Sequence, residues 1–215
     1  MKDAYSQRKG LQRMFLLALV LFIVLFFYAH QGRRRAVPNI PDPVQTEASG
    51  QEQIELDGYQ ITIQYLYQYD ICGLVVSTHN YPGSGIGDKL APRDIALAWG
   101  SVAAYNDSID FHWRQSGRWY SWQAASYAVL EPVGGVEGVT LQSSNNHVIP
   151  ADKTVKKAVK QIRTGDYIRL TGYLVRIDGT RSDGSTFLWQ SSTVRSDTGA
   201  GSCEVVYVTG VEWLD

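Results

Sequence analysis

The segment YQITIQYLYQYDICGLVVSTH, residues 59–79, constrains the fold more than any other part of the chain. It is rich in β-branched and aromatic residues, and apolar side chains recur at alternate positions: Tyr59, Ile61, Ile63, Tyr65 and Tyr67. Because side chains alternate between the two faces of a strand, this spacing predicts one largely buried face. We expect two strands, or one long bent strand with Gly73 at a bend or bulge.

Further strands are predicted towards the end of the chain. Residues 163–179 begin at a Gly165-Asp166 turn and then alternate, with Gly172 in the middle. A glycine at such a position lets a small sheet coil tightly. The segments FLWQSSTVR and CEVVYVTGVEWL supply two closing strands, and the aromatic-rich residues 109–123 predict a hairpin around Ser116-Gly117.

Two short helices are expected. One covers residues 92–105, where Pro92 suits the first turn and the apolar residues suit a buried face. The other covers residues 152–162, whose apolar residues recur at helical spacing, with lysines between them and Asp152 as the N-cap. Residues 143–150, SSNNHVIP, are predicted to be the loop that leads into this second helix.

The fold class predicted from these elements is mainly β (α+β). Residues 54–215 should form a partly closed, antiparallel β-barrel-like domain with the two short helices. One transmembrane helix is expected to precede it.

The apolar run MFLLALVLFIVLFFYA carries the prediction of a membrane anchor. We assign residues 14–30 to a single transmembrane helix, after a basic tail over residues 1–13. A cleaved signal peptide is the alternative, but the residues after the run lack the small-x-small pattern of a cleavage site. Residues 31–53, with three closely spaced prolines, are expected to be an extended stalk.

Charge is distributed unevenly along the chain. The whole chain carries a net charge of −1, and residues 1–35 hold seven Lys/Arg against one Asp, so the remainder carries −7. An acidic domain argues against nucleic acid as a partner. We expect a single-pass protein of the inner membrane that contacts the bilayer through residues 14–30. Its C-terminal domain should lie outside the cytoplasm. The expected partner is an envelope protein or a glycan.

Two cysteines, Cys72 and Cys203, allow at most one internal disulfide, which would be compatible with an extracytoplasmic domain. The alternative is two buried thiols that pack as small apolar side chains. Neither cysteine has a C-x-x-C neighbour, which disfavours redox catalysis and a structural zinc site.

Four segments resemble one group of bacterial single-span membrane proteins. They are PRDIALAWG, SSNNHVIPAD, GDYIRLTGYLV and SSTVRSDTGAGSCEVVYV, which together run from about Pro92 to Val208. The resemblance implies a bacterial envelope protein with one coherent fold. It implies no particular activity.

His147, Cys203 and Arg195 are the candidate catalytic residues. A thiol nucleophile needs a partner that stabilises its thiolate, and an oxyanion needs a donor such as arginine. The order of His147 and Cys203 is loosely similar to that in sortases, which are also membrane-anchored β-barrels. In sortases the nucleophile is the cysteine that ends a Thr-x-x-Cys strand, and the arginine follows it in the chain. Here Cys203 follows Gly-Ser, and Arg195 precedes it. The structural alternative is that His147 is a loop residue whose ring nitrogen bonds a backbone carbonyl and that Cys203 is a small residue at the start of a strand. Arg195 would then belong to a loop ion pair or a cap.

A binding function without catalysis is the leading expectation from the sequence, and a thiol-dependent acyl-transfer enzyme, either a peptidase or a sortase-like transpeptidase, is the alternative. Amphipathic aromatic rings and loop amides can line a groove for peptide or glycan. No metal-ligand spacing or nucleotide-binding motif is present, so no cofactor is expected. The candidate binding residues are Asn145, Asn146, Trp119, Trp122 and Trp189.

Overall fold

The computed structural model describes residues 13–22, 34–194, 196 and 203–214. The chain divides into two compact units, Met1–Arg33 and Arg34–Asp215. In the first unit residues 13–22 are helical, and residues 23–30 of the predicted anchor lie outside the described part. Among the helices that the structure describes, none combines the length and the apolar character needed to cross a bilayer.

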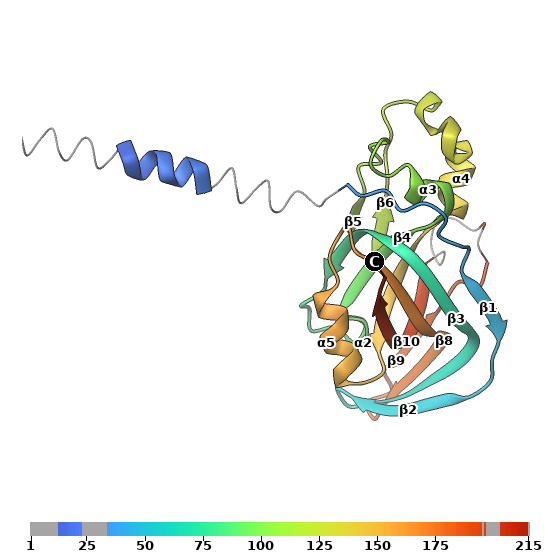
Figure 1. Cartoon of the computed structure of the whole chain (residues 1–215). Coiled ribbons are helices and arrows are strands. Elements are labelled where there is room, and N and C mark those ends of the chain that lie inside the picture. Colours follow the sequence, from blue (N-terminus) through green and yellow to red (C-terminus); the bar gives the residue numbers. More distant parts are fainter. Residues whose placement is uncertain (1–12, 23–33, 195, 197–202, 215) are drawn as a thin grey trace, which may run out of the picture. The chain divides into compact units, whose positions relative to one another are not determined.

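The second unit is mainly β, and most of its described strands belong to one sheet of eight strands (Figure 1). Its strands are β1 (Val44–Glu47), β2 (Gln51–Leu56), β3 (Tyr59–Asn80), β4 (Arg93–Ala98), β7 (Ser143–Pro150), β8 (Tyr167–Arg181), β9 (Thr186–Gln190) and β10 (Glu204–Trp213). The three strands β3, β8 and β10 therefore confirm the strand predictions for residues 59–79, 163–179 and 203–214.

The strand pairings form a closed circuit. From β3 it runs through β4, β7, β10 and β8, and β8 pairs along its length with β3 again. Four of these five pairings are antiparallel, whereas β7 and β10 run parallel. The expectation of an antiparallel sheet therefore holds for most of the circuit but not at β7–β10.

Strand β3 is one long bent strand, the second of the two forms predicted. Its register shifts at Tyr65–Tyr67 and at Val75–Ser77, so the bulges lie on either side of Gly73 rather than at it. At Gly172 a Cβ would collide with the carbonyl oxygen of Tyr207 on β10. That glycine lets β8 and β10 approach closely, as expected for a tightly coiled sheet.

Two predictions for the middle of the chain are wrong. Residues 93–98 form strand β4 rather than the start of a helix, and helix α3 covers only Gly100–Ala104. Residues 143–150 form strand β7 rather than a loop. Both strands are buried on both faces, which removes the alternation that marks a half-buried strand, and the polar residues of β7 suggest a loop.

The described helices of the second unit are short, and there are more of them than the two expected. They are α2 (Ile86–Leu90), α3, the 3-10 helix η1 (Ala128–Val133), α4 (Gly135–Leu141) and α5 (Lys153–Gln161). The prediction for α5 is confirmed, because the Asp152 side chain accepts a hydrogen bond from the Val155 amide at 2.8 Å. At the other end, Arg93 donates to the carbonyl oxygens of Val159, Lys160 and Ile162.

The predicted stalk is largely part of the folded unit. Strand β1 pairs with β3, and strand β2 begins at Gln51 and forms a hairpin with β3. Val37 and Ile40 are buried in the core. The three prolines prevent regular structure locally, as expected, but the chain around them packs on the sheet instead of standing apart from it.

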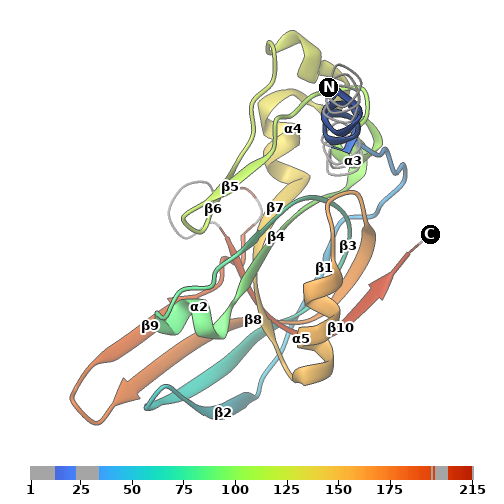
Figure 2. The same ribbon diagram turned by 90° about the vertical axis from the view of Figure 1, so that its left-hand side faces the viewer.

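The core has two clusters on opposite faces of the sheet. Val148, Val206 and Val208 belong to the larger cluster, which α3, α4 and α5 help to form. Ile149 and Val205 belong to the smaller one, together with residues of α2 and β9. A separate hairpin, β5 (Arg114–Ser116) and β6 (Trp119–Ser121), confirms the turn predicted at Ser116-Gly117 (Figure 2).

Candidate functional site

Strands β4 and β7 carry a group of buried polar side chains. Asp94, Asn145, Asn146 and His147 are each at most 4% exposed. Burying polar groups is costly unless they find partners, so a cluster of this kind in the centre of a sheet indicates a specific role. Asp94, Asn145 and His147 share the face of the smaller core cluster, as the pairing register and the position of Ile149 require.

Asp94 and His147 are directly opposite each other on β4 and β7. Asp94 Oδ1 lies 2.9 Å from His147 Nδ1, and the two side chains are 0% and 5% exposed. The two atoms are close without being aligned as a hydrogen bond, which is common in active sites before substrate binds. A carboxylate in this position favours the proton on Nδ1 and leaves Nε2 as the basic nitrogen.

Arg118, at the tip of the β5–β6 hairpin, extends the cluster. Its Nη1 donates to Asp94 Oδ1 at 2.8 Å and to the carbonyl oxygen of Ala91 at 2.8 Å. Its Nη2 donates to Asp88 Oδ1 at 2.6 Å and to the carbonyl oxygen of Gly87 at 3.2 Å. Arg118 has a φ of 73° and Gly117 one of 57°, as expected for the two central residues of a tight hairpin turn.

Two aromatic rings enclose the guanidinium group of Arg118. The group lies 3.6 Å from the ring centre of Tyr81 and 5.5 Å from that of Trp189. Trp189 also lies against His147, with 4.9 Å between the ring centres. Burial, and next the nearby charge of Asp94, raise the pKa of Tyr81 to about 12.

Cys203 lies beside this group. It immediately precedes Glu204, which pairs with Asn146 on the parallel strand β7, so Cys203 is level with Asn145 and two residues before the level of His147. Two residues correspond to about 7 Å along a strand, a diagonal separation that side chains on one face can bridge. Asn145 Nδ2 donates to Cys203 Sγ at 3.7 Å, and Sγ donates to the carbonyl oxygen of Arg118 at 3.8 Å.

The orientation of the Asn145 amide follows from its partners. Its Nδ2 lies 3.2 Å from the carbonyl oxygen of Arg118, which can only accept, and its Oδ1 accepts from Gln115 Nε2 at 2.6 Å. The amide hydrogens are therefore directed to the hairpin tip and to the Cys203 sulfur. A donor at this position stabilises negative charge on sulfur or on an adjacent oxyanion.

The structure brings together four of the eight predicted site residues: His147, Cys203, Asn145 and Trp189. Asn146 points to the opposite face, where its Nδ2 donates to the Ile95 carbonyl oxygen and Ser144 Oγ. Trp119 is 47% exposed on the hairpin, and Trp122 packs against the larger core cluster. Arg195 lies outside the described residues. Cys72 and Cys203 are not joined in a disulfide.

Sequence reasoning missed Asp94 and Arg118. Asp94 stands in RDIALAWG, where a charged residue inside a run of apolar residues would have indicated a buried partner if the segment had been assigned to a strand. Arg118 follows the predicted turn directly, but nothing local indicates that the turn folds back onto β7. In the parts of the chain that the structure describes, no three His, Cys, Asp or Glu side chains converge as a metal site.

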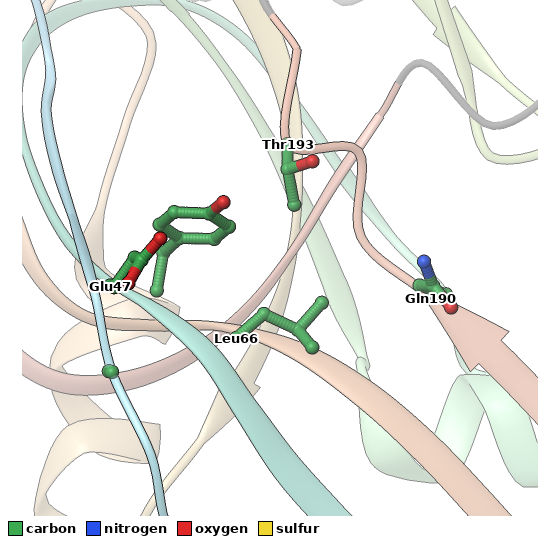
Figure 3. A pocket seen from close by; sticks show the side chains of 6 residues that line it. Glu47, Leu66, Gln190 and Thr193 are labelled. Carbon is green, nitrogen blue, oxygen red and sulfur yellow. The ribbon is translucent and has the colours of Figure 1, made fainter.

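A shallow pocket borders the segment that follows β9. It has a volume of ≈ 400 Å³ and is lined by Glu47, Ala48, Leu66, Tyr67, Gln190 and Thr193 (Figure 3). Gln45 Nε2 on β1 donates to the Thr193 carbonyl oxygen at 3.1 Å, and the Ser192 amide donates to the Cys203 carbonyl oxygen at 3.1 Å. The same short segment therefore borders this pocket and braces the backbone of Cys203.

Comparison with protein-family models, with curated proteins and with solved structures gave no match to this chain.

Proposed function

We propose that this chain is a membrane-tethered envelope protein whose domain carries a thiol-dependent acyl-transfer site. Cys203 is the nucleophile, His147 the general base, and Asp94 the residue that positions the imidazole. The observation that supports this best is the placement of Asp94 Oδ1 at 2.9 Å from His147 Nδ1, with Cys203 on the same face of the next strand. A nucleophile, a base and a group that orients the base form the general arrangement of nucleophilic catalysis.

The reaction follows from the groups present. Nε2 of His147 takes the Cys203 thiol proton, and the thiolate attacks an acyl carbonyl carbon, forming a C–S bond. The bond from that carbon to the leaving amine or alcohol breaks, and the leaving group takes the proton from Nε2. Water or an acceptor amine then attacks the thioester carbon and its proton passes to Nε2. The C–S bond breaks, and Nε2 returns that proton to the Cys203 sulfur, which restores the thiol.

The oxyanion of this reaction needs a donor. Asn145 supplies one, because its amide hydrogens are directed to Cys203 Sγ. Arg195 remains the second donor in this proposal, as the sequence suggests; its position lies outside the described residues.

We infer a closed five-stranded barrel of the OB type for the domain. Numbered along the chain, the strands of the circuit follow the order first (β3), second (β4), third (β7), fifth (β10), fourth (β8), and helix α5 lies between the third and fourth. OB barrels bind ligands on the face of strands two and three, between the loops that follow strands one and four. Asp94 and His147 lie on those two strands, and Asp88, Trp189 and Cys203 come from those two connections.

The location is part of the proposal. The apolar run over residues 14–30 is long enough, with its flanking basic residues, to anchor the chain in the inner membrane as a single-pass protein. The acidic domain then lies outside the cytoplasm, where an envelope peptide or a peptide-bearing glycan is the substrate.

A second candidate is a domain that binds or scaffolds an envelope component without catalysis. One observation favours it: the Cys203 sulfur contacts the Arg118 carbonyl oxygen and His147 is only 4% exposed, so the polar cluster is closed in this conformation. Binding would then use exposed aromatic side chains such as Trp119 and Tyr127, which are 47% and 82% exposed.

The test is acylation of the full-length protein in detergent with 4-nitrophenyl acetate. Mass spectrometry should find the acetyl group on Cys203, and Cys203→Ser should abolish the release of nitrophenolate above background. Replacing the base in His147→Gln should slow acylation by about a hundredfold or more. Cys72→Ser is the matched control, with an unchanged rate.

Equal acylation of Cys72 and Cys203 would remove the enzyme proposal. In that case, crosslinking in cells should recover the same envelope partner with wild-type protein and with Cys203→Ser. Recovery of no reproducible partner would count against the binding proposal as well.

A further inference from the structure

The residues around the Arg118 guanidinium group are of the kinds that bind guanidinium: carboxylates, carbonyl oxygens and an aromatic ring. Asp88 and Asp94 accept from it at 2.6 and 2.8 Å, the carbonyl oxygens of Ala91 and Gly87 accept at 2.8 and 3.2 Å, and the Tyr81 ring stacks on it at 3.6 Å. Planar stacking combined with in-plane acceptors suits guanidinium better than ammonium. We call Tyr81, Gly87, Asp88, Ala91, Asp94 and Trp189 the guanidinium cage.

The cage is built without the hairpin. Its residues come from the end of β3 and the connection to β4, from β4 itself, and from β9. Asp94 is fully buried, so a charge of opposite sign is needed beside it whichever group supplies that charge. Arg118 fills this place from a separate element, the β5–β6 hairpin.

That hairpin is a minor element of the fold. Its strands have three residues each and pair only with each other in the described structure. A two-stranded hairpin is marginally stable by itself, so its position depends on contacts made by its side chains. Besides Arg118, these include Gln115 Nε2 to Asn145 Oδ1 and the Tyr120 hydroxyl to Ser143.

The hairpin tip also covers the thiol. The carbonyl oxygen of Arg118 accepts from Cys203 Sγ at 3.8 Å and from Asn145 Nδ2 at 3.2 Å. An acyl group cannot reach the sulfur from this side while the tip is in place. The residue that fills the cage with its side chain therefore blocks the sulfur with its backbone.

We propose that the cage is a subsite for the guanidinium group of an arginine-containing peptide, filled in the resting state by Arg118 as an internal plug. A peptide arginine displaces the Arg118 side chain and the hairpin tip lifts. Cys203, which is partly exposed in the resting state, then becomes accessible from the hairpin side as well. The importance of that accessibility for catalysis rests on the proposed function; the displacement itself does not.

The test measures alkylation of Cys203 by iodoacetamide in the full-length protein in detergent, in a Cys72→Ser background. Arg118→Ala should raise the alkylation rate by about ten- to a hundredfold, the change expected when a charge-assisted hydrogen bond holds the closed state. Asp88→Asn, which alters only the more exposed carboxylate of the cage, should raise it less. Arg169→Ala is the control, because Arg169 pairs with a carboxylate, that of Asp70, away from the site, and it should leave the rate unchanged.

Peptide binding is tested on the protein with Arg118 intact. N-acetyl-arginine-amide should accelerate Cys203 alkylation in a saturable manner, and the corresponding lysine and citrulline amides should have weaker effects at equal concentration. No acceleration by the arginine amide would overturn the peptide subsite, and an unchanged rate in both Arg118→Ala and Asp88→Asn would overturn the plug. Neither readout needs turnover, so a failure of the proposed enzyme activity is distinguishable from a failure of this inference.

Discussion

Replacing Asp94 by Asn tests whether the buried ion cluster holds the site together. The side chain is 0% exposed, and its Oδ1 lies 2.8 Å from Arg118 Nη1 and 2.9 Å from His147 Nδ1. Asn keeps the shape and removes the charge. Arg118, whose side chain is 21% exposed, then has Asp88 as its remaining carboxylate. Removing one partner of a buried pair costs about 3–5 kcal/mol of unfolding free energy, and Asn keeps one acceptor, so we expect about 2–4 kcal/mol.

For a domain of this size, such a loss lowers the melting temperature by about 5–15 °C. The assay is thermal unfolding followed by circular dichroism. Asp70→Asn is the matched control, because Asp70 also accepts hydrogen bonds from an arginine, Arg169, but its side chain is 32% exposed. Water screens that pair, so its removal should lower the melting temperature much less. Equal shifts for the two variants would refute the argument that burial makes the Asp94 cluster important.

Three further predictions concern the scaffold and its response to pH. Asp152→Ala should cost about 1 kcal/mol of unfolding free energy in a urea titration, because the Val155 amide loses its acceptor, and Lys153→Ala should cost much less. Gly172→Ala should cost about 1–3 kcal/mol, because its Cβ would collide with the Tyr207 carbonyl oxygen, whereas Gly85→Ala meets only ordinary contacts and should be nearly neutral. The raised pKa of Tyr81 predicts that the unfolding free energy falls as pH rises between about 10 and 12, because the unfolded chain releases the phenol proton first. Tyr81→Phe should reduce this fall, measured by urea titrations at about pH 9 and pH 11. The same fall in the variant and in the wild type would contradict the prediction.

The elements that the sequence predicts correctly are those whose signal is local. Helix α5 has helical periodicity and a capping aspartate, and the hairpin has a Ser-Gly turn between aromatic residues. Strands β3, β8 and β10 have long runs of β-branched and aromatic residues. Each of these signals lies within the segment it describes, so it can be read without knowledge of the neighbours.

Strands β4 and β7 lack a local sequence signal, because their strand conformation depends on the neighbouring strands of the sheet. Six consecutive buried residues in β4 have no strand periodicity, and the serines, asparagines and histidine of β7 are typical of a loop. Their polar side chains are acceptable inside the sheet only because partners arrive from distant segments, as Arg118 reaches Asp94 and Gln115 reaches Asn145. The sequence therefore predicts His147 and Cys203, because their side chains are reactive. It does not predict Asp94 and Arg118, because only the fold brings them together with His147 and Cys203.

The position of β10 between β7 and β8 has a consequence for biogenesis. It is the last of the described strands along the chain, and it joins two strands that precede it, β7 and β8, in the closed circuit of pairings. A nascent chain that ends before residue 204 would expose two unpaired strand edges, which readily recruit other polypeptides. Polypeptides interrupted before residue 204 should therefore aggregate or be degraded, because β7 and β8 then lack their shared partner strand.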